Sequence, residues 1–149
     1  MALNKTTLRT NLQGLFENPN SDPVVLAGQW KSVMQSYASG LVPPSTTVST
    51  AAATLKTTLQ ALFAAPGSPA AAAMDAAFLA FGATVAGGQL PTFTGIPPSG
   101  PPGFVAGVAP PFPTTNAAAA TKWANIIHAW MKTGSATLVA PPNTPTPWT

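Results

Sequence analysis

Residues 7–19 read TLRTNLQGLFENP, and residues 54–66 read TLKTTLQALFAAP. Eight of these 13 positions are identical, and Arg9 is matched by Lys56. In each copy, three leucines and a phenylalanine fall at i, i+4, i+7 and i+8, the spacing that puts apolar side chains on one helix face. Each copy ends at a proline, which cannot continue a helix. The stretch therefore predicts two similar amphipathic helices, 47 residues apart.

A fresh helix start follows each copy, Ser21-Asp22-Pro23 in one and Ser68-Pro69 in the other. A side-chain oxygen at the cap and a proline in the first turn suit the unpaired N–H groups of a helix start. Three further apolar helical patterns each begin with an aromatic residue, Trp30, Phe78 or Trp123. These three residues are 48 and 45 positions apart. This spacing indicates duplicated helix–turn–helix units of about 47 residues. The alternative is that Leu-rich amphipathic helices resemble each other by chance.

The predicted fold class is all-α, with about five helices near 5–17, 23–39, 47–64, 69–86 and 115–132 and no sheet beyond short strand-like pieces. We interpret residues 1–149 as a single helical domain. Its parts are repeat-like units at 5–40 and 47–88, a Pro-rich arm at 89–114, a helix at 115–133 and an extended C-terminal tail at 134–149. The predicted core consists of the apolar positions on these helical faces: Leu8, Leu12, Leu15, Phe16, Trp30, Val33, Met34, Tyr37, Leu55, Leu59, Leu62, Phe63, Phe78, Phe81, Val85, Trp123, Ile126, Ile127 and Trp130.

The segments 89–114 and 138–149 are rich in proline but also carry large apolar side chains. Proline removes backbone donors and favours extended conformations, whereas a solvated linker has little use for aromatic anchors. We therefore expect both segments to be arms that bind neighbouring subunits; the alternative is disorder, which proline and glycine abundance also indicates. The predicted interface residues are Phe93, Ile96, Phe104, Val105, Phe112, Leu138, Val139 and Trp148.

Charged residues make up only 6% of the chain, against about 25% in ordinary soluble domains. Because a free monomer relies on a charged surface for solubility, such a chain is better suited to a place among neighbours that cover it. The net charge of +3 and the pI of about 9.7 arise from scarce acids. The six cations are spread singly along the chain without a stripe, so we expect no nucleic-acid binding.

Few residues are suited to catalysis. His128 is the only histidine and reads as a helix-boundary residue, and Glu17, Asp22 and Asp75 form no visible acid–base pair. Asp22 is better explained as a helix cap, and Asp75 as a solvated first-turn carboxylate. The sequence has no cysteine, nucleophile elbow or phosphate-binding loop. We therefore predict no catalytic residue, cofactor, metal or small-molecule substrate.

The N-terminal residues lack the apolar core of a signal peptide, and prolines and glycines interrupt the longest uncharged run, 76–121. We accordingly predict no membrane partner and synthesis in the cytoplasm.

The stretch 110–142, PPFPTTNAAAATKWANIIHAWMKTGSATLVAPP, ends a helix in an aromatic-x2-Thr-Gly sequence, followed by a short apolar piece and prolines. In this it resembles the C-terminal part of small virion structural proteins of tailed bacteriophages, over about residues 111–145. The resemblance implies a component of the tail, baseplate or neck of a phage particle, located in the virion. It implies no catalytic residue.

Both lines of reasoning favour a non-enzymatic structural subunit that holds copies of itself and other phage structural proteins through helical faces and Pro-rich arms. Two alternatives remain. One is an interaction adaptor that presents proline motifs in 97–113 to SH3-type or WW modules. The other is a small enzyme that uses His128.

Overall fold

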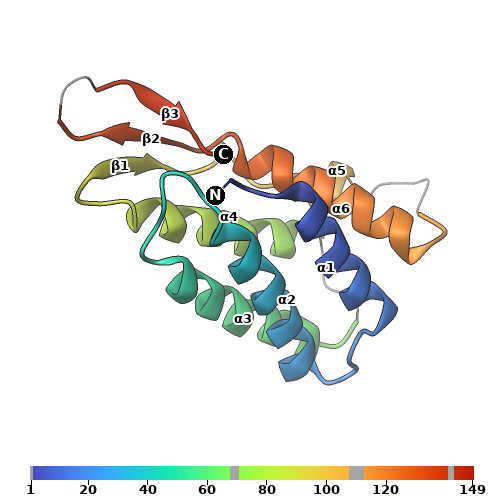
Figure 1. Cartoon of the computed structure of the whole chain (residues 1–149). Coiled ribbons are helices and arrows are strands. Elements are labelled where there is room, and N and C mark those ends of the chain that lie inside the picture. Colours follow the sequence, from blue (N-terminus) through green and yellow to red (C-terminus); the bar gives the residue numbers. More distant parts are fainter. Residues whose placement is uncertain (1, 68–70, 108–112, 141–142) are drawn as a thin grey trace.

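The computed structural model describes residues 2–67, 71–107, 113–140 and 143–149. Five long helices dominate it: α1 (Lys5–Glu17), α2 (Pro23–Ala38), α3 (Val48–Ala64), α4 (Ala71–Gly87) and α6 (Asn116–Met131) (Figure 1). A short helix, α5 (Phe104–Gly107), and three short strands, β1 (Phe93–Ile96), β2 (Ser135–Leu138) and β3 (Pro145–Pro147), complete the described elements. A mostly helical class and the five predicted helices are therefore confirmed, whereas the all-α prediction without a sheet is wrong, because the three short strands pair into one sheet.

Side-chain caps fix the starts of three helices. Asn4 accepts a hydrogen bond from the Thr7 N–H (3.0 Å), and Asp22 accepts one from the Val24 N–H (2.8 Å) ahead of a proline at the first position of α2. Thr115 accepts the Ala118 N–H at the start of α6 (3.1 Å). Each cap satisfies an N–H group that has no partner inside its helix. The predicted role of Asp22 is thus confirmed, whereas the Ser68-Pro69 cap lies outside the described residues.

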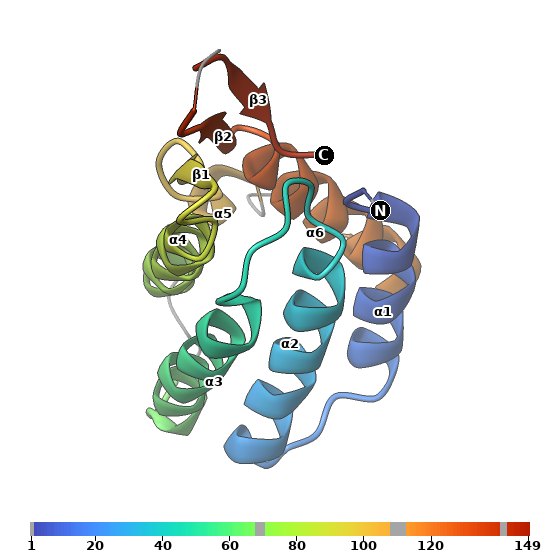
Figure 2. The same ribbon diagram turned by 60° about the vertical axis from the view of Figure 1, so that its left-hand side comes forward.

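The helices are arranged side by side in the order α4, α3, α2, α1, α6, and α5 lies between α6 and α4 (Figure 2). α1 packs chiefly against α6, and α2 chiefly against α3. The predicted unit 5–40 is therefore not a self-contained helix pair, and the expected duplicated arrangement is wrong in this respect. The aromatic ring of Phe16 in α1 contacts both Trp30 of α2 and Trp123 of α6.

A connected group of six aromatic rings fills the centre of the bundle. Trp30, Phe78 and Trp123 are contributed by three different helices, and Trp30 lies 5.9 Å from Phe78 and 5.6 Å from Trp123 between ring centroids. Most of these pairs meet edge to face, the geometry that aromatic quadrupoles favour. The sequence repeat supplies this core from α1, α2, α4 and α6, and α5 adds one more ring, that of Phe104.

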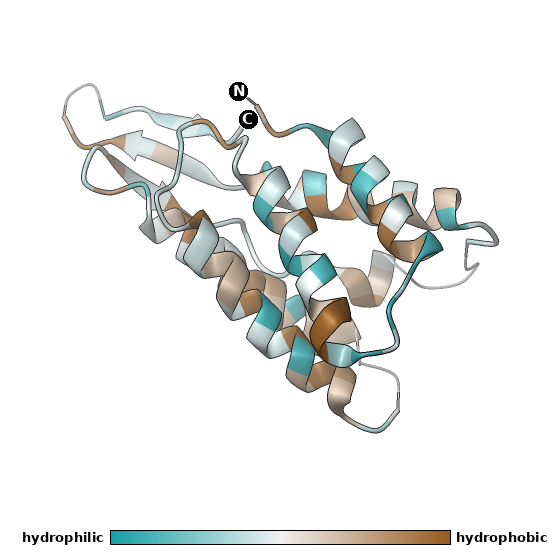
Figure 3. Ribbon diagram, turned by 60° about the horizontal axis from the view of Figure 1, so that its bottom comes forward, coloured by the Kyte–Doolittle hydropathy of each residue, from teal (hydrophilic) through white to brown (hydrophobic). Residues whose placement is uncertain are grey.

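The predicted core is confirmed: every residue of that set is buried or packs against the buried cluster. Figure 3 shows hydrophobic and hydrophilic residues alternating along the long helices, as expected where apolar residues recur every three or four positions. The prediction missed core residues outside the helical periodicity. The largest of these are Phe104 and Trp148, both completely buried, and Met131 at the end of α6.

The three strands form one antiparallel sheet in the order β1-β2-β3. Phe93 of β1 lies opposite Leu138 of β2, and Ser135 of β2 lies opposite Pro147 of β3. The sheet projects from one end of the bundle (Figure 1). The expected separate arm at 89–114 and extended tail at 134–149 are therefore wrong where they are described, because strands from both segments pair with each other.

Gln89 connects the base of this sheet to the bundle. Its side chain is buried, donates to the Pro43 carbonyl (2.9 Å) and accepts the indole N–H of Trp148 (3.2 Å). Its own carbonyl accepts the Phe93 N–H (3.0 Å). Through its side-chain amide and its backbone carbonyl, Gln89 thus connects the α2–α3 connection, the first strand and the C-terminal residues, which fixes the position of the sheet.

Candidate functional site

The structure divides four of the predicted interface residues, Phe93, Ile96, Leu138 and Val139, between the two faces of the sheet. Side chains alternate across a strand, and Gly95 lies against the Ala86 carbonyl of α4, so Phe93 and Gly95 face the bundle. Leu138, opposite Phe93, lies on the same inner side, and both side chains are half-buried. Ile96 therefore lies on the other side, where its side chain is exposed.

We call this other side the outer face of the sheet. It consists of the residues that alternate away from the bundle on the three strands, together with the position after β2: Thr94, Ile96, Ser135, Thr137, Val139, Pro145 and Pro147. Ile96 is 46% exposed and Val139 is 54% exposed. The ladder reaches Val139 because its N–H donates to the Thr92 carbonyl (3.1 Å). Two of the predicted interface residues, from segments 43 positions apart, are thus brought onto one surface.

The outer face carries no charge. No charged residue occurs in the sequence between Asp75 and Lys122 or after Lys132. The surface instead offers hydroxyl groups, proline rings and two branched aliphatic side chains. Depletion of charge is a common feature of the buried centre of protein interfaces.

The free β3 edge of the sheet offers no backbone N–H to another strand. The Trp148 N–H donates inward, to the Gly134 carbonyl (3.0 Å), so the backbone nitrogens at 145 and 147 point away from β2. Both positions are proline and have no N–H to donate. The next outward donor, Thr149, is bound to the Val42 carbonyl (3.3 Å). A partner strand therefore finds no backbone donor along β3.

Phe104 and Trp148 occupy the protein's own core, and the expectation that they contact a neighbour is corrected accordingly. The Phe104 ring lies 5.0 Å from Phe78 and 4.5 Å from Trp123. The Trp148 ring lies directly over Gly134, in space that a Cβ atom would fill. Both side chains are completely buried, because each completes an apolar surface that the helices alone leave open.

Asp75 explains how the Pro-rich segment is held. Its carboxylate is buried and accepts the N–H groups of Gly103 (2.9 Å), Phe104 (2.8 Å) and Val105 (3.4 Å) at the start of α5. The expectation of a solvated Asp75 is therefore wrong. A proline-rich backbone offers few donors, and here three consecutive donors meet one carboxylate.

One further predicted interface residue, Val105, lies away from the sheet and is 59% exposed on α5. The structure thus does not bring Val105 together with Ile96 and Val139. The last of the predicted set, Phe112, lies outside the described residues.

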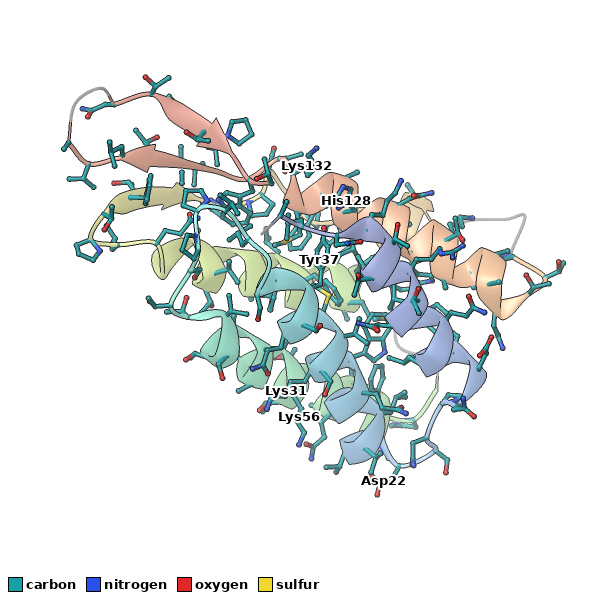
Figure 4. The ribbon with its side chains drawn as sticks, viewed as in Figure 1. Asp22, Lys31, Tyr37, Lys56, His128 and Lys132 are labelled. Carbon is teal, nitrogen blue, oxygen red and sulfur yellow. The ribbon has the colours of Figure 1, made fainter. Side chains whose placement is uncertain are left out.

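A separate polar site surrounds His128. Its Nδ1 lies 2.7 Å from the Tyr37 hydroxyl, which joins α6 to the end of α2 (Figure 4). Burial raises the pKa of the Tyr37 phenol, so it stays protonated and can either donate to Nδ1 or accept from it, according to the tautomer of the imidazole. Burial, followed by the nearby charges of Lys132 and Lys5, lowers the pKa of His128. The imidazole is therefore neutral at neutral pH.

The Tyr37–His128 pair lines a pocket of about 720 Å³ with Asn4, Lys5 and the hydroxyls of Thr7, Ser36 and Ser39. A pocket of this size that contains convergent polar groups can hold a small molecule. Periodicity alone identified Tyr37 as a core residue and His128 as a boundary residue. Nothing in the spacing indicated that they meet, because the contact joins positions 91 residues apart.

The remaining carboxylates lie elsewhere. Glu17 accepts a hydrogen bond from the Gln13 amide (2.7 Å) at the far end of α1, and Asp22 caps α2. Among the described residues, no three His, Cys, Asp or Glu side chains are grouped as metal ligands. The arrangement thus gives the Tyr37–His128 pair no neighbouring carboxylate.

An apolar groove, which the sequence did not indicate, lies between α1 and α2. It has a volume of about 760 Å³, and its walls include Gly14, Gly28 and the exposed side chains of Val24 and Val25. A Cβ atom at Gly14 would meet nothing within 4 Å, so this glycine keeps the groove open.

No helix in the described ranges is long and apolar enough to span a bilayer. Comparison of the chain with protein-family models, curated proteins and solved structures finds no match in any of the three.

Proposed function

We propose that this chain is a non-enzymatic structural subunit of a phage particle and that it contacts a neighbouring subunit through the outer face of its sheet. The observation that carries the proposal is the gathering of Ile96 and Val139 on a projecting, uncharged surface whose β3 edge offers no backbone N–H. The resemblance of residues 111–145 to small virion proteins supports the phage assignment. Copies of this chain and other particle proteins are the proposed partners.

The physical argument concerns the cost of covering this surface. Burying Ile96 and Val139 removes apolar area from water, and no charge on the sheet has to be desolvated in exchange. The threonine and serine hydroxyls can be satisfied by a partner backbone or by water. Because the β3 edge offers no donor, we expect two such sheets to meet through their faces and not through β3.

The test replaces Ile96 or Val139 by glutamate. A carboxylate on the outer face must be desolvated on contact, so we expect assembly to be lost while the helical circular dichroism signal is unchanged. Leu79→Glu is the matched control, because Leu79 is an exposed leucine on α4, away from the sheet. Incorporation is measured by mass spectrometry of purified particles, and self-association by sedimentation velocity. Equal incorporation of all three variants would contradict the proposal.

The Pro-motif adaptor has less support. Such ligands present an exposed polyproline helix to an aromatic groove. In the described part of the segment, Pro98 and Phe104 are buried.

A small enzyme is the second candidate, since the neutral His128 in its polar pocket is suited to accept or relay a proton. Loss of a measurable activity in His128→Ala, with assembly retained, would favour it.

A further inference from the structure

We infer that the cleft between α1 and α6 binds the oxyanion group of a small molecule, such as a phosphate or sulfate. The cleft has a volume of about 260 Å³ and is lined by Lys5, Thr6, Arg9, Thr121, Ala124 and Asn125. It adjoins the Tyr37–His128 pocket, because Lys5 lines both. The inference is independent of the structural role proposed above.

The first argument is the set of donors. Lys5 and Arg9 are one helical turn apart on α1, and Asn125 faces them from α6. Arginine, lysine and amide groups are the side chains that bind oxyanions through charge-assisted hydrogen bonds. Within the described part of the chain, none of these three side chains has a hydrogen bond or an ion pair. Their donors are therefore available to a ligand.

The second argument is an electrostatic conflict that a ligand would relieve. Two like charges at i and i+4 repel, and cations in the first turns of a helix oppose its dipole. No acidic residue lies in the first turn of α1 or in either adjoining pocket. The charges that affect His128 are also positive, namely Lys5 from α1 and Lys132 from its own helix. An anion would neutralise this potential, which no side chain does.

His128 gives the site a predicted pH dependence. It lies one turn after Asn125 on α6, and the groups around it are Lys5 from α1, Tyr37 from α2 and Lys132 from α6. A bound anion favours the imidazolium, so by linkage the protonated imidazole favours the anion. Acidification should therefore strengthen binding. Tyr37 can keep the hydrogen bond in this state by accepting from Nδ1.

The test is a titration of the full chain with sodium sulfate, monitored by amide NMR shifts at constant ionic strength. Sulfate is chosen because it keeps its charge between about pH 5.5 and about pH 8, so any change in affinity belongs to the protein. We expect shifts centred on residues 4–9 and 121–128. Lys5→Gln and Arg9→Gln should each weaken binding about tenfold. Lys31→Gln is the matched control, because Lys31 lies on α2 and lines neither pocket.

The pH dependence is tested with the variant His128→Gln. This variant should bind sulfate with equal affinity at both pH values, whereas the native chain should bind sulfate more tightly at the lower pH. Equal weakening by Lys5→Gln and Lys31→Gln, or shifts spread over all lysines, would overturn the inference. A short single-stranded DNA is the competing source of phosphate. If it binds with equal dependence on Lys31 and Lys5, the contact is diffuse and the localised site is wrong.

Discussion

Replacement of Trp148 by alanine tests whether the C-terminal residues belong to the protein's own core. Trp148 is completely buried over Gly134, and its indole N–H is bound to Gln89. Truncation of a buried tryptophan to alanine costs roughly 3–5 kcal/mol through lost apolar contacts and the cavity that remains. We expect the isolated chain to lose stability by this amount.

Two further variants separate the contributions. Trp148→Phe keeps most of the ring but removes the indole N–H, so the buried side-chain oxygen of Gln89 loses its donor. This loss costs about 1–3 kcal/mol. Thr146→Ala is the control, because Thr146 is exposed on the same strand, and a surface change of this kind stays within about 0.5 kcal/mol.

The assay is urea unfolding at low protein concentration, followed by circular dichroism. For an m-value of about 2 kcal/mol per M, the expected loss for Trp148→Ala moves the midpoint by about 2 M. An unchanged midpoint would refute the reasoning, because it is the result expected of an arm that is ordered only by a neighbouring subunit. A shift that appears only at concentrations where the chain self-associates would refute it in the same way.

Three other predictions use the same unfolding assay. Leu12→Ala and Leu59→Ala, equivalent positions of the repeat that are both fully buried, should each cost roughly 2–5 kcal/mol, and a harmless change at either would show that the two copies are not equivalent. Asp75→Ala should cost about 1–3 kcal/mol because three N–H groups at α5 lose their acceptor, and an unaltered midpoint would contradict this cap. Because folding lowers the pKa of His128, the unfolded chain takes up the proton more readily; stability should be complete above the ordinary value of 6.5 and decrease as the pH falls through it. His128→Gln should remove that decrease, and a slope retained in the variant would assign it to another group.

The helices could be predicted because their signals are local. The apolar spacing of Leu8, Leu12 and Leu15 repeats within a few residues, and caps such as Asp22 lie beside the helices that they start. The same information says which face of a helix is apolar but not which helix covers it. The packing of α1 against α6 brings together residues more than a hundred positions apart, such as Phe16 and Trp123, so the repeat alone suggested the wrong partner.

The candidate sites could be predicted only in part. Composition predicted Ile96 and Val139 as interface residues, because large apolar side chains in Pro-rich segments stand out in any sequence, and both side chains are exposed. It could not separate them from Phe93 and Leu138, since that division depends on strand register. The pairing of Tyr37 with His128 and the grouping of Lys5 and Arg9 with Asn125 both require tertiary structure, and no spacing predicts them.

The same sequence features that indicated arms explain why these segments dock on their own chain. Asp75 and Gln89 are the buried charged and polar side chains of the described ranges, and both find their partners in the Pro-rich regions. If Phe104 moved away to contact a neighbouring subunit, the Asp75 carboxylate would remain buried without its donor. If Trp148 did so, the Gln89 amide would remain buried without its donor. Each lost partner costs about 1–3 kcal/mol. Proline lowers the entropy lost on docking, because it already restricts the unfolded chain. Aromatic anchors on a stiff backbone therefore favour the nearest complementary surface. Here that surface lies within the same chain, whereas Ile96 and Val139 are exposed on the outer face of the sheet.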